Sequence, residues 1–230
     1  HEYISLFYKI RGEAKADTND DAGAINDFNK TIELDPDYAE AYKLRGCSRF
    51  SMGDPKEALI DLDRALVIDP ELKSAYFSRA VNKQKLGMYN ESVIDWTKCI
   101  DMKGDLYFAY AQRANANCAC EKYVEEISDC NFLIENNQQL EEGLNCRGRS
   151  NEGLGQLDEA VSDYLAAYDI TKKLYYMYSA ALAYSKSEKY EEAILKFSEI
   201  IEIDPDCSDA YYQRGLSKYY QKNYYEALED

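Results

Sequence analysis

The stretch Ala39–Leu72 reads AEAYKLRGCSRFSMGDPKEALIDLDRALVIDPEL, and it contains two helical patterns separated by a turn. In its first half, apolar and small residues recur at three- and four-residue intervals, which places them on one side of a helix. Gly53-Asp54-Pro55 then breaks the pattern, because glycine tolerates the turn and proline suits the first position of a new helix. The second half repeats the helical spacing and ends at Asp69-Pro70. The stretch therefore predicts a pair of packed helices.

The same pattern recurs along the whole chain of 230 residues. When positions are counted from Ala39, position 4 is usually tyrosine, position 8 is glycine or alanine, and position 20 is small in nearly every copy. The residues at position 20 are Ala24, Ala58, Ser92, Glu126, Ala160, Ala193 and Ala227. The step between copies is 34 residues, except for one step of 33. One hairpin has too little interior to stand alone, so we expect the copies to stack on their neighbours.

A 34-residue period with these aromatic and small positions, a bulky residue at position 24 and a closing proline in several copies resembles the tetratricopeptide repeat family. The chain resembles an Arg-Gly and Asp-rich variant of that repeat. The resemblance implies an all-α fold, a right-handed α-solenoid of helix-turn-helix repeats, forming one domain over residues 1–230. Six full repeats and a truncated seventh are expected at about 5–38, 39–72, 73–106, 107–140, 141–173, 174–207 and 208–230. We also expect the chain to be a fragment of a longer array.

Positions 7 and 23 hold arginine and aspartate in six of the seven copies. Both change together in repeat six, to Ala180 and Lys196. Removing one partner of a desolvated ion pair is costly, whereas replacing both partners by packing groups can be nearly neutral. We therefore predict Arg–Asp pairs that join helices, either within a repeat or to the next one, over the alternative that these are ordinary surface charges. The predicted pairs are Arg45 with Asp61, Arg79 with Asp95, Arg113 with Asp129, and Arg147 with Asp163.

The family resemblance also implies that positions 2, 5, 6, 9, 12 and 13 of each first helix face a concave groove. The groove candidates are Leu44, Cys47, Phe50, Phe77, Val81, Phe108, Gln112, Asn115, Asn145, Arg149 and Tyr178. This lining is mostly uncharged and partly aromatic, although the chain has a net charge of −16. We expect it to accept an extended or helical partner peptide, with Phe77, Val81 and Phe108 as apolar anchors and the amides bonding main-chain groups. The alternative is that several of these side chains only complete helix packing.

Glu126 is the one charged residue at position 20, where two helices should approach closely. An unpaired buried charge costs several kcal/mol. We therefore expect its carboxylate either to extend outward to solvent or to pair with a nearby arginine.

Composition excludes several classes of function. The net charge of −16 argues against nucleic acid as a partner, and no apolar run approaches the roughly 18 residues of a membrane span. We expect no signal peptide, and seven cysteines without a pairing pattern favour buried thiols in a reducing, cytoplasmic compartment. The only histidine is His1, so neither a metal site nor a cofactor is expected. The oligomeric state is left open.

These observations predict a non-enzymatic scaffold that binds a protein partner or subunit, as a component of a larger assembly. No usable histidine, phosphate-binding glycine loop or nucleophile motif supports catalysis. One alternative is a co-chaperone adaptor, but the lysine, asparagine and arginine residues with which such relatives clamp chaperone tails are missing here. Another is the regulatory repeat region of an enzyme whose catalytic domain lies outside this segment.

Overall fold

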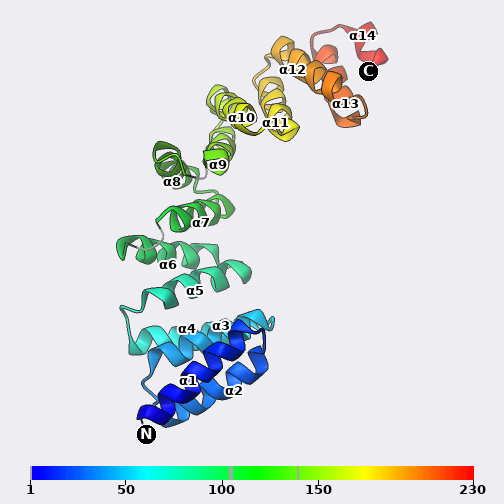
Figure 1. Ribbon diagram of the computed structural model, residues 1–230. Helices are drawn as coiled ribbons and strands as arrows, with labels where there is room; N and C mark the ends of the chain where they lie inside the picture. The colour runs from blue at the N-terminus through cyan, green and yellow to red at the C-terminus, as the bar shows by residue number, and fades with distance from the viewer. Residues whose placement is uncertain (1, 104–105, 139) are drawn as a thin grey trace. The chain divides into compact units, whose positions relative to one another are not determined.

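The computed structural model describes residues 2–103, 106–138 and 140–230, and these residues form fourteen helices and no strand (Figure 1). The predicted all-helical repeat solenoid is thereby confirmed. The chain divides into two compact units, one ending at Ala116 and the other running from Asn117 to Asp230. The division falls within α7 (Leu106–Ala119). His1, the only histidine, lies outside the described residues.

The first unit consists of consecutive antiparallel helix pairs. Its helices before α7 are α1 (Glu2–Asp17), α2 (Asp21–Leu34), α3 (Ala39–Ser51), α4 (Pro55–Ile68), α5 (Lys73–Lys85) and α6 (Tyr89–Asp101). Each odd-numbered helix packs on the next even-numbered one, and α2 and α4 also pack on the first helix of the following repeat. Ala58 of α4 is fully buried, and a Cβ built on Gly46 of α3 would lie 3.1 Å from the Ala58 carbonyl oxygen. Small residues therefore set the close approach of the two helices.

The second unit repeats this pairing. Its helices are α8 (Tyr123–Glu135), α9 (Leu140–Gly153), α10 (Leu157–Thr171), α11 (Leu174–Lys186), α12 (Tyr190–Ile203), α13 (Ser208–Tyr220) and α14 (Tyr224–Glu229). Met177 and Ala181 of α11 are buried against Phe197, Ile200 and Ile201 of α12. This cluster also holds Ala210 of α13, so the first helix of each new repeat completes the core of the one before.

The turns between helices follow from local chemistry. Asp54 caps α4, because its carboxylate accepts a hydrogen bond from the Glu57 amide and Pro55 occupies the first turn. Gly53 precedes it with a φ of +86°, a conformation that costs glycine little. At the end of α10, Lys172 adopts the left-handed conformation and its amide donates to the Tyr168 carbonyl oxygen.

The structure places the position 7 arginines against the position 23 aspartates of the same repeat. Arg45, Arg79 and Arg147 each donate through Nε and Nη2 to one aspartate, and the shortest N–O distance is 2.6 Å in every case. The acceptors are Asp61, Asp95 and Asp163. In two other repeats with the same arginine and aspartate positions, Arg11 pairs with Asp27 and Arg214 with Asp230 in the same way. Arg113 and Asp129 fall in different units, so their pairing stays a prediction.

The remaining nitrogen of the same guanidinium reaches the preceding repeat. Arg45 Nη1 donates to Asn29 at 2.7 Å, and Arg79 Nη1 donates to Asp63 at 2.8 Å. In the same way, Arg113 Nη1 donates to Thr97, Arg147 Nη1 to Asn131 and Arg214 Nη1 to Ser198. Arg45, Arg79, Arg147 and Arg214 therefore each join three helices, two in their own repeat and one in the repeat before, and Arg113 joins α7 to α6.

The electrostatic consequence is clearest at Asp27. Hydrogen bonding from Arg11 lowers the pKa of this carboxyl group, and Lys15 adds to the effect. Because the folded-state pKa is depressed, this stabilisation is complete above the pKa of an unfolded aspartate and is lost as the pH falls through the lowered value. Acid should therefore loosen the α1–α2 pair.

Repeat six lacks this Arg–Asp pair, because Ala180 and Lys196 occupy the two positions. Ala180 is fully buried with Ala183, and Tyr184 packs against them. Lys196 forms an ion pair with Glu199 on its own helix. The structure therefore contains both solutions at the same position, an ion pair in most repeats and apolar packing in one.

Gly148 offers a steric test of the helix pairing. A Cβ built there would lie 2.8 Å from Cε1 of Tyr164, whose ring is 2 % exposed and whose hydroxyl donates to Glu152. We expect Gly148→Ala to lower the free energy of unfolding by about 1–3 kcal/mol, because the ring cannot retreat. Gly46→Ala is the matched control and should cost less, since its closest contact is 3.1 Å. Urea denaturation followed by circular dichroism measures both; equal changes would contradict the steric account.

Candidate functional site: an aromatic groove in the first unit

Four of the predicted groove residues line one hollow between α3 and α5. Cys47 and Phe50 come from α3, and Phe77 and Val81 come from α5. The hollow has a volume of about 170 Å³, and its lining is mainly apolar. Ser78 closes one side, with its hydroxyl oxygen 3.3 Å from the Cys47 sulfur. The structure therefore brings these four side chains together around one hollow.

Phe77 is the centre of an aromatic cluster. Its ring stacks on Phe108 of α7 with a centroid separation of 5.4 Å, and it meets the edge of Trp96 at 5.2 Å. Trp96 is fully buried beneath, whereas Phe77 keeps 38 % of its surface exposed. Such offset and edge-on arrangements are favourable for aromatic rings. The cluster therefore holds Phe77 at the surface on a rigid support.

A second, larger hollow of about 530 Å³ lies on the other side of Phe77. Leu72, Cys99 and Ala109 form its apolar floor, and Asp69 and Glu71 stand at its rim. Burial, together with the nearby Asp95, raises the pKa of the Cys99 thiol to about 11. The thiol is therefore protonated at neutral pH and contributes apolar surface rather than a nucleophile.

The other predicted residues of the first unit line neither hollow. Leu44 is half-buried on α3, and Asn115 is exposed on α7. The Gln112 carbonyl oxygen accepts a hydrogen bond from Gln84 Nε2 at 3.0 Å, which joins α7 to α5. Polar contacts to a partner main chain from Gln112 and Asn115 stay a prediction.

The second unit holds the remaining three candidates. Tyr178 packs edge-on against Phe197 at 5.6 Å and therefore completes helix packing. Arg149 is exposed on α9, and the amide oxygen of Asn145 is buried without a hydrogen-bond partner among the described residues. These side chains do not extend the aromatic cluster of the first unit.

Glu126 lies beside Arg149 rather than reaching solvent. Its carboxylate is fully buried and accepts a hydrogen bond from the Cys146 thiol at 2.9 Å, while Arg149 Nη2 is 3.9 Å away. Two outcomes were expected for the Glu126 carboxylate. Exposure to solvent is wrong, and the ion pair with Arg149 forms at a long N–O distance. The other oxygen, Oε2, has no hydrogen-bond partner within the described chain. Burial and this carboxylate raise the pKa of the neighbouring Cys118 to about 11.

Sequence reasoning missed the part that Trp96 plays at this site. Its place at position 24 identified it as a bulky packing residue, but not as the support of Phe77. The available indication was that the single tryptophan of the chain occupies a position filled elsewhere by phenylalanine, leucine, cysteine or tyrosine. A larger ring at that point extends from the core to the base of the groove.

Other kinds of site find no support in the described ranges. There, no cluster of three or more histidine, cysteine or acidic side chains is arranged to hold a metal ion, and all seven cysteines are free. No helix in those ranges has both the length and the apolar character needed to cross a membrane.

Comparison with known proteins agrees with the repeat architecture. Residues 173–207 match the family model for the tetratricopeptide repeat. No curated protein sequence matches the chain. Among solved structures it is similar to YrrB, a tetratricopeptide repeat protein with an unusual peptide-binding site, at 23% identity and a TM-score of 0.68, covering 80% of this chain and 95% of that one.

Two further structures share the fold. One is a tetratricopeptide repeat protein from Parabacteroides merdae, with 16% identity, a TM-score of 0.69, and coverage of 98% of this chain and 90% of the other. The second is the first repeat domain of Spaghetti bound to an HSP90 peptide, with 18% identity and a TM-score of 0.51 over 52% of this chain and 95% of that one. Residues 173–207 therefore match a tetratricopeptide repeat, and the chain shares the helical-repeat fold of these solved structures.

Proposed function

We propose that this chain is a non-enzymatic scaffold whose first unit binds an extended or helical segment of a protein partner. The observation that carries the proposal is the exposed Phe77 ring, which stands between two apolar hollows on a support of Trp96 and Phe108. Exposed aromatic anchors beside pockets are typical of binding hot spots. The peptide-binding site of YrrB and the HSP90 peptide bound by Spaghetti support this kind of partner for the fold.

The rim of the larger hollow indicates the chemistry of the partner segment. Asp69 and Glu71 stand beside an apolar floor, and Lys73 next to them donates its ammonium group to the Lys103 carbonyl oxygen at 2.9 Å. The lining therefore carries two carboxylates and one ammonium group, within a chain of net charge −16. A segment with one large apolar residue next to lysine or arginine fits both features.

A peptide display library panned against the chain tests this proposal. We expect selected sequences to contain a large apolar residue flanked by lysine or arginine. Binding of those peptides should fall at least tenfold on Phe77→Ala combined with Phe108→Ala, because both anchor rings are removed. Circular dichroism establishes that the variant keeps its helices.

Val67→Ala serves as the matched control. Val67 is 70% exposed on the second helix α4 and lines neither hollow, so binding should be unchanged. If the double variant binds the selected peptides as well as the parent chain does, the groove is not the binding site.

A further inference from the structure

The two hollows beside Phe77 share one wall but differ in size and in charge. The Phe77 ring lines both of them, and their volumes are about 170 and 530 Å³. Asp69, Glu71 and Lys73 lie in the lining of the larger hollow, whereas only uncharged residues of the described chain line the smaller one. A segment that covers Phe77 therefore meets an uncharged hollow on one side and a hollow of net negative charge on the other.

The distance between the hollows follows from α5, which lines both. The larger hollow contacts this helix at Lys73, Ser74 and Phe77. The smaller hollow contacts it at Phe77, Ser78 and Val81, the same set moved by four residues. The hollows are therefore offset by about one helical turn, or about 6 Å along α5. Side chains at i and i+2 of an extended segment are separated by about 6–7 Å and point to the same side.

Two hydroxyl groups favour an extended segment over a helical one. Ser74 lies at the larger hollow and Ser78 at the smaller, one turn apart on the same side of α5. An extended segment has main-chain N–H and C=O groups that need partners, and hydroxyls both donate and accept. A helix has already paired these groups internally, so it would cover the hydroxyls without bonding them.

We infer that the partner segment is extended and carries two apolar side chains separated by one residue, which enter the two hollows on either side of Phe77. A group the size of benzene occupies a cavity of about 150 Å³, so one medium-sized apolar side chain fills the smaller hollow. The larger hollow takes a large apolar residue, and the adjacent lysine or arginine lies on this side only. The inference rests on the proposed function and adds the second anchor, the spacing and the place of the cation.

Two labelled peptides, GSLSFKSG and GSKFSLSG, present the same anchors in opposite chain directions, and the tighter of the two is the probe. Fluorescence anisotropy with the 230-residue chain should show saturable binding. Replacing the leucine by glycine, or inserting a second serine between the two anchors, should each weaken binding at least fivefold. Equal or tighter binding after the insertion would overturn the spacing, as would the absence of binding by both peptides.

Matched substitutions in the chain assign each anchor to its hollow. Val81 is half-buried at the smaller hollow, and Ser74 is exposed at the larger one. Val81→Phe should weaken the probe at least fivefold but leave the glycine-substituted peptide within twofold, because that peptide has no side chain to displace. Ser74→Phe should weaken both peptides, since both carry the phenylalanine. Circular dichroism establishes that the variants keep their helices, and equal losses of the two peptides on Val81→Phe would contradict the assignment.

The place of the cation is tested by removing the carboxylates. Asp69→Asn combined with Glu71→Gln should weaken the probe at least threefold, and the asparagine keeps an oxygen to accept from the amide of residue 71, as Asp69 does at 2.9 Å. A peptide of the same composition, with the lysine moved beside the leucine, should bind the parent chain more weakly and should not respond to this variant. Equal losses for the two peptides would reduce the effect to overall charge and overturn this part of the inference.

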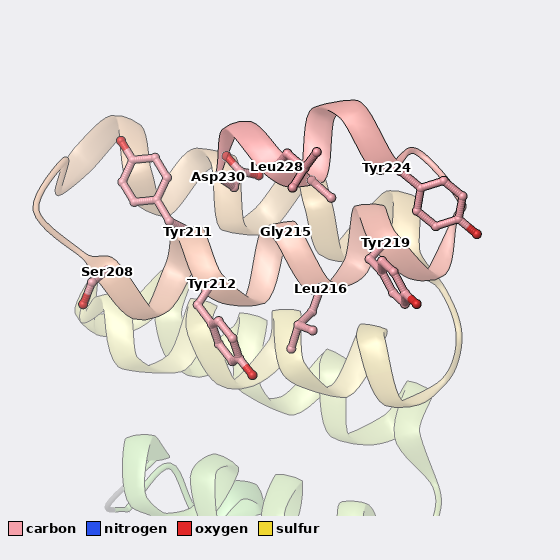
Figure 2. A pocket seen from close by; sticks show the side chains of 10 residues that line it. Ser208, Tyr211, Tyr212, Gly215, Leu216, Tyr219, Tyr224, Leu228 and Asp230 are labelled. Carbon is pink, nitrogen blue, oxygen red and sulfur yellow. The ribbon is translucent and has the colours of Figure 1, made fainter.

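A separate apolar hollow of about 630 Å³ in the second unit provides the control surface. It runs along α13 and α14, where Tyr212 and Leu216 project from the same side of α13 (Figure 2). Tyr212→Ala should leave the affinity for the probe within twofold of the parent chain. A loss of tenfold would place the probe on that surface and overturn the inference.

Failure of this inference is distinguishable from failure of the proposed function. The proposed function fails if Phe77→Ala with Phe108→Ala leaves binding of the library-selected peptides unchanged. If that double variant abolishes their binding while the spacing and charge changes have no effect on the probe, the groove is the binding site and the two-anchor inference is wrong.

Discussion

Asp95→Ala is expected to lower the free energy of unfolding by about 3–5 kcal/mol, the cost of leaving buried charges without their partner. Asp95 is fully buried, and it accepts hydrogen bonds from both Arg79 and Lys83, with N–O distances of 2.6 and 2.7 Å. Arg79 and Lys83 are themselves 18% and 12% exposed at the side chain, so solvent compensates little for the loss. Urea denaturation followed by circular dichroism measures the change.

Asp63→Ala is the matched control for this prediction. Asp63 accepts from the same guanidinium at 2.8 Å, but 53% of its side chain is exposed. An exposed ion pair contributes about 0–1 kcal/mol, so this variant should change the unfolding midpoint only slightly. Comparable losses for Asp63→Ala and Asp95→Ala would show that burial does not decide the energetics.

A double-mutant cycle isolates the pair itself. Arg79→Ala combined with Asp95→Ala should cost less than the sum of the two single changes, because the second removal relieves an uncompensated charge. Repeat six is the natural precedent, since Ala180 and Tyr184 replace the ion pair there by packing. Strict additivity would mean that the two side chains contribute independently.

The sequence predicted this pair because two columns change together, but it could not predict the third contact of the arginine. The acceptors in the preceding repeat are Asn29, Asp63, Thr97, Asn131 and Ser198. Only asparagine occurs more than once among them, and what all five side chains share is an oxygen atom that can accept a hydrogen bond. Because different residue types accept the same hydrogen bond, a search for recurring residues in the sequence does not detect this contact.

The groove shows a similar limit. The family resemblance implied that Cys47, Phe50, Phe77 and Val81 lie on one face, and the structure brings them to one hollow. The same resemblance also selected Tyr178, which packs on Phe197. A repeat position specifies the face of a helix, whereas the depth of a side chain depends on the residues of the neighbouring helix. Glu126 illustrates this point, because its burial beside Cys146 depends on α9 and not on its own helix.

Trp96 is where the fold and the proposed binding site depend on the same side chain. It is fully buried, lies 5.2 Å from Phe77 and 5.9 Å from Phe108, and packs with Ala80 and Cys99. We expect Trp96→Ala to lower the free energy of unfolding by about 3–5 kcal/mol, as other large-to-small core substitutions do. The same change should weaken peptide binding, because Phe77 and Phe108 lose their support.

Trp96→Phe tests whether the indole N–H contributes to stability or to peptide binding. The indole nitrogen is buried and has no hydrogen-bond partner among the described residues, so removing its N–H leaves no acceptor unsatisfied. We expect this variant to cost less than about 1.5 kcal/mol and to keep most of the binding to the selected peptides. A loss as large as that of Trp96→Ala would show that a phenyl ring cannot support Phe77, and that the groove requires the full width of the indole.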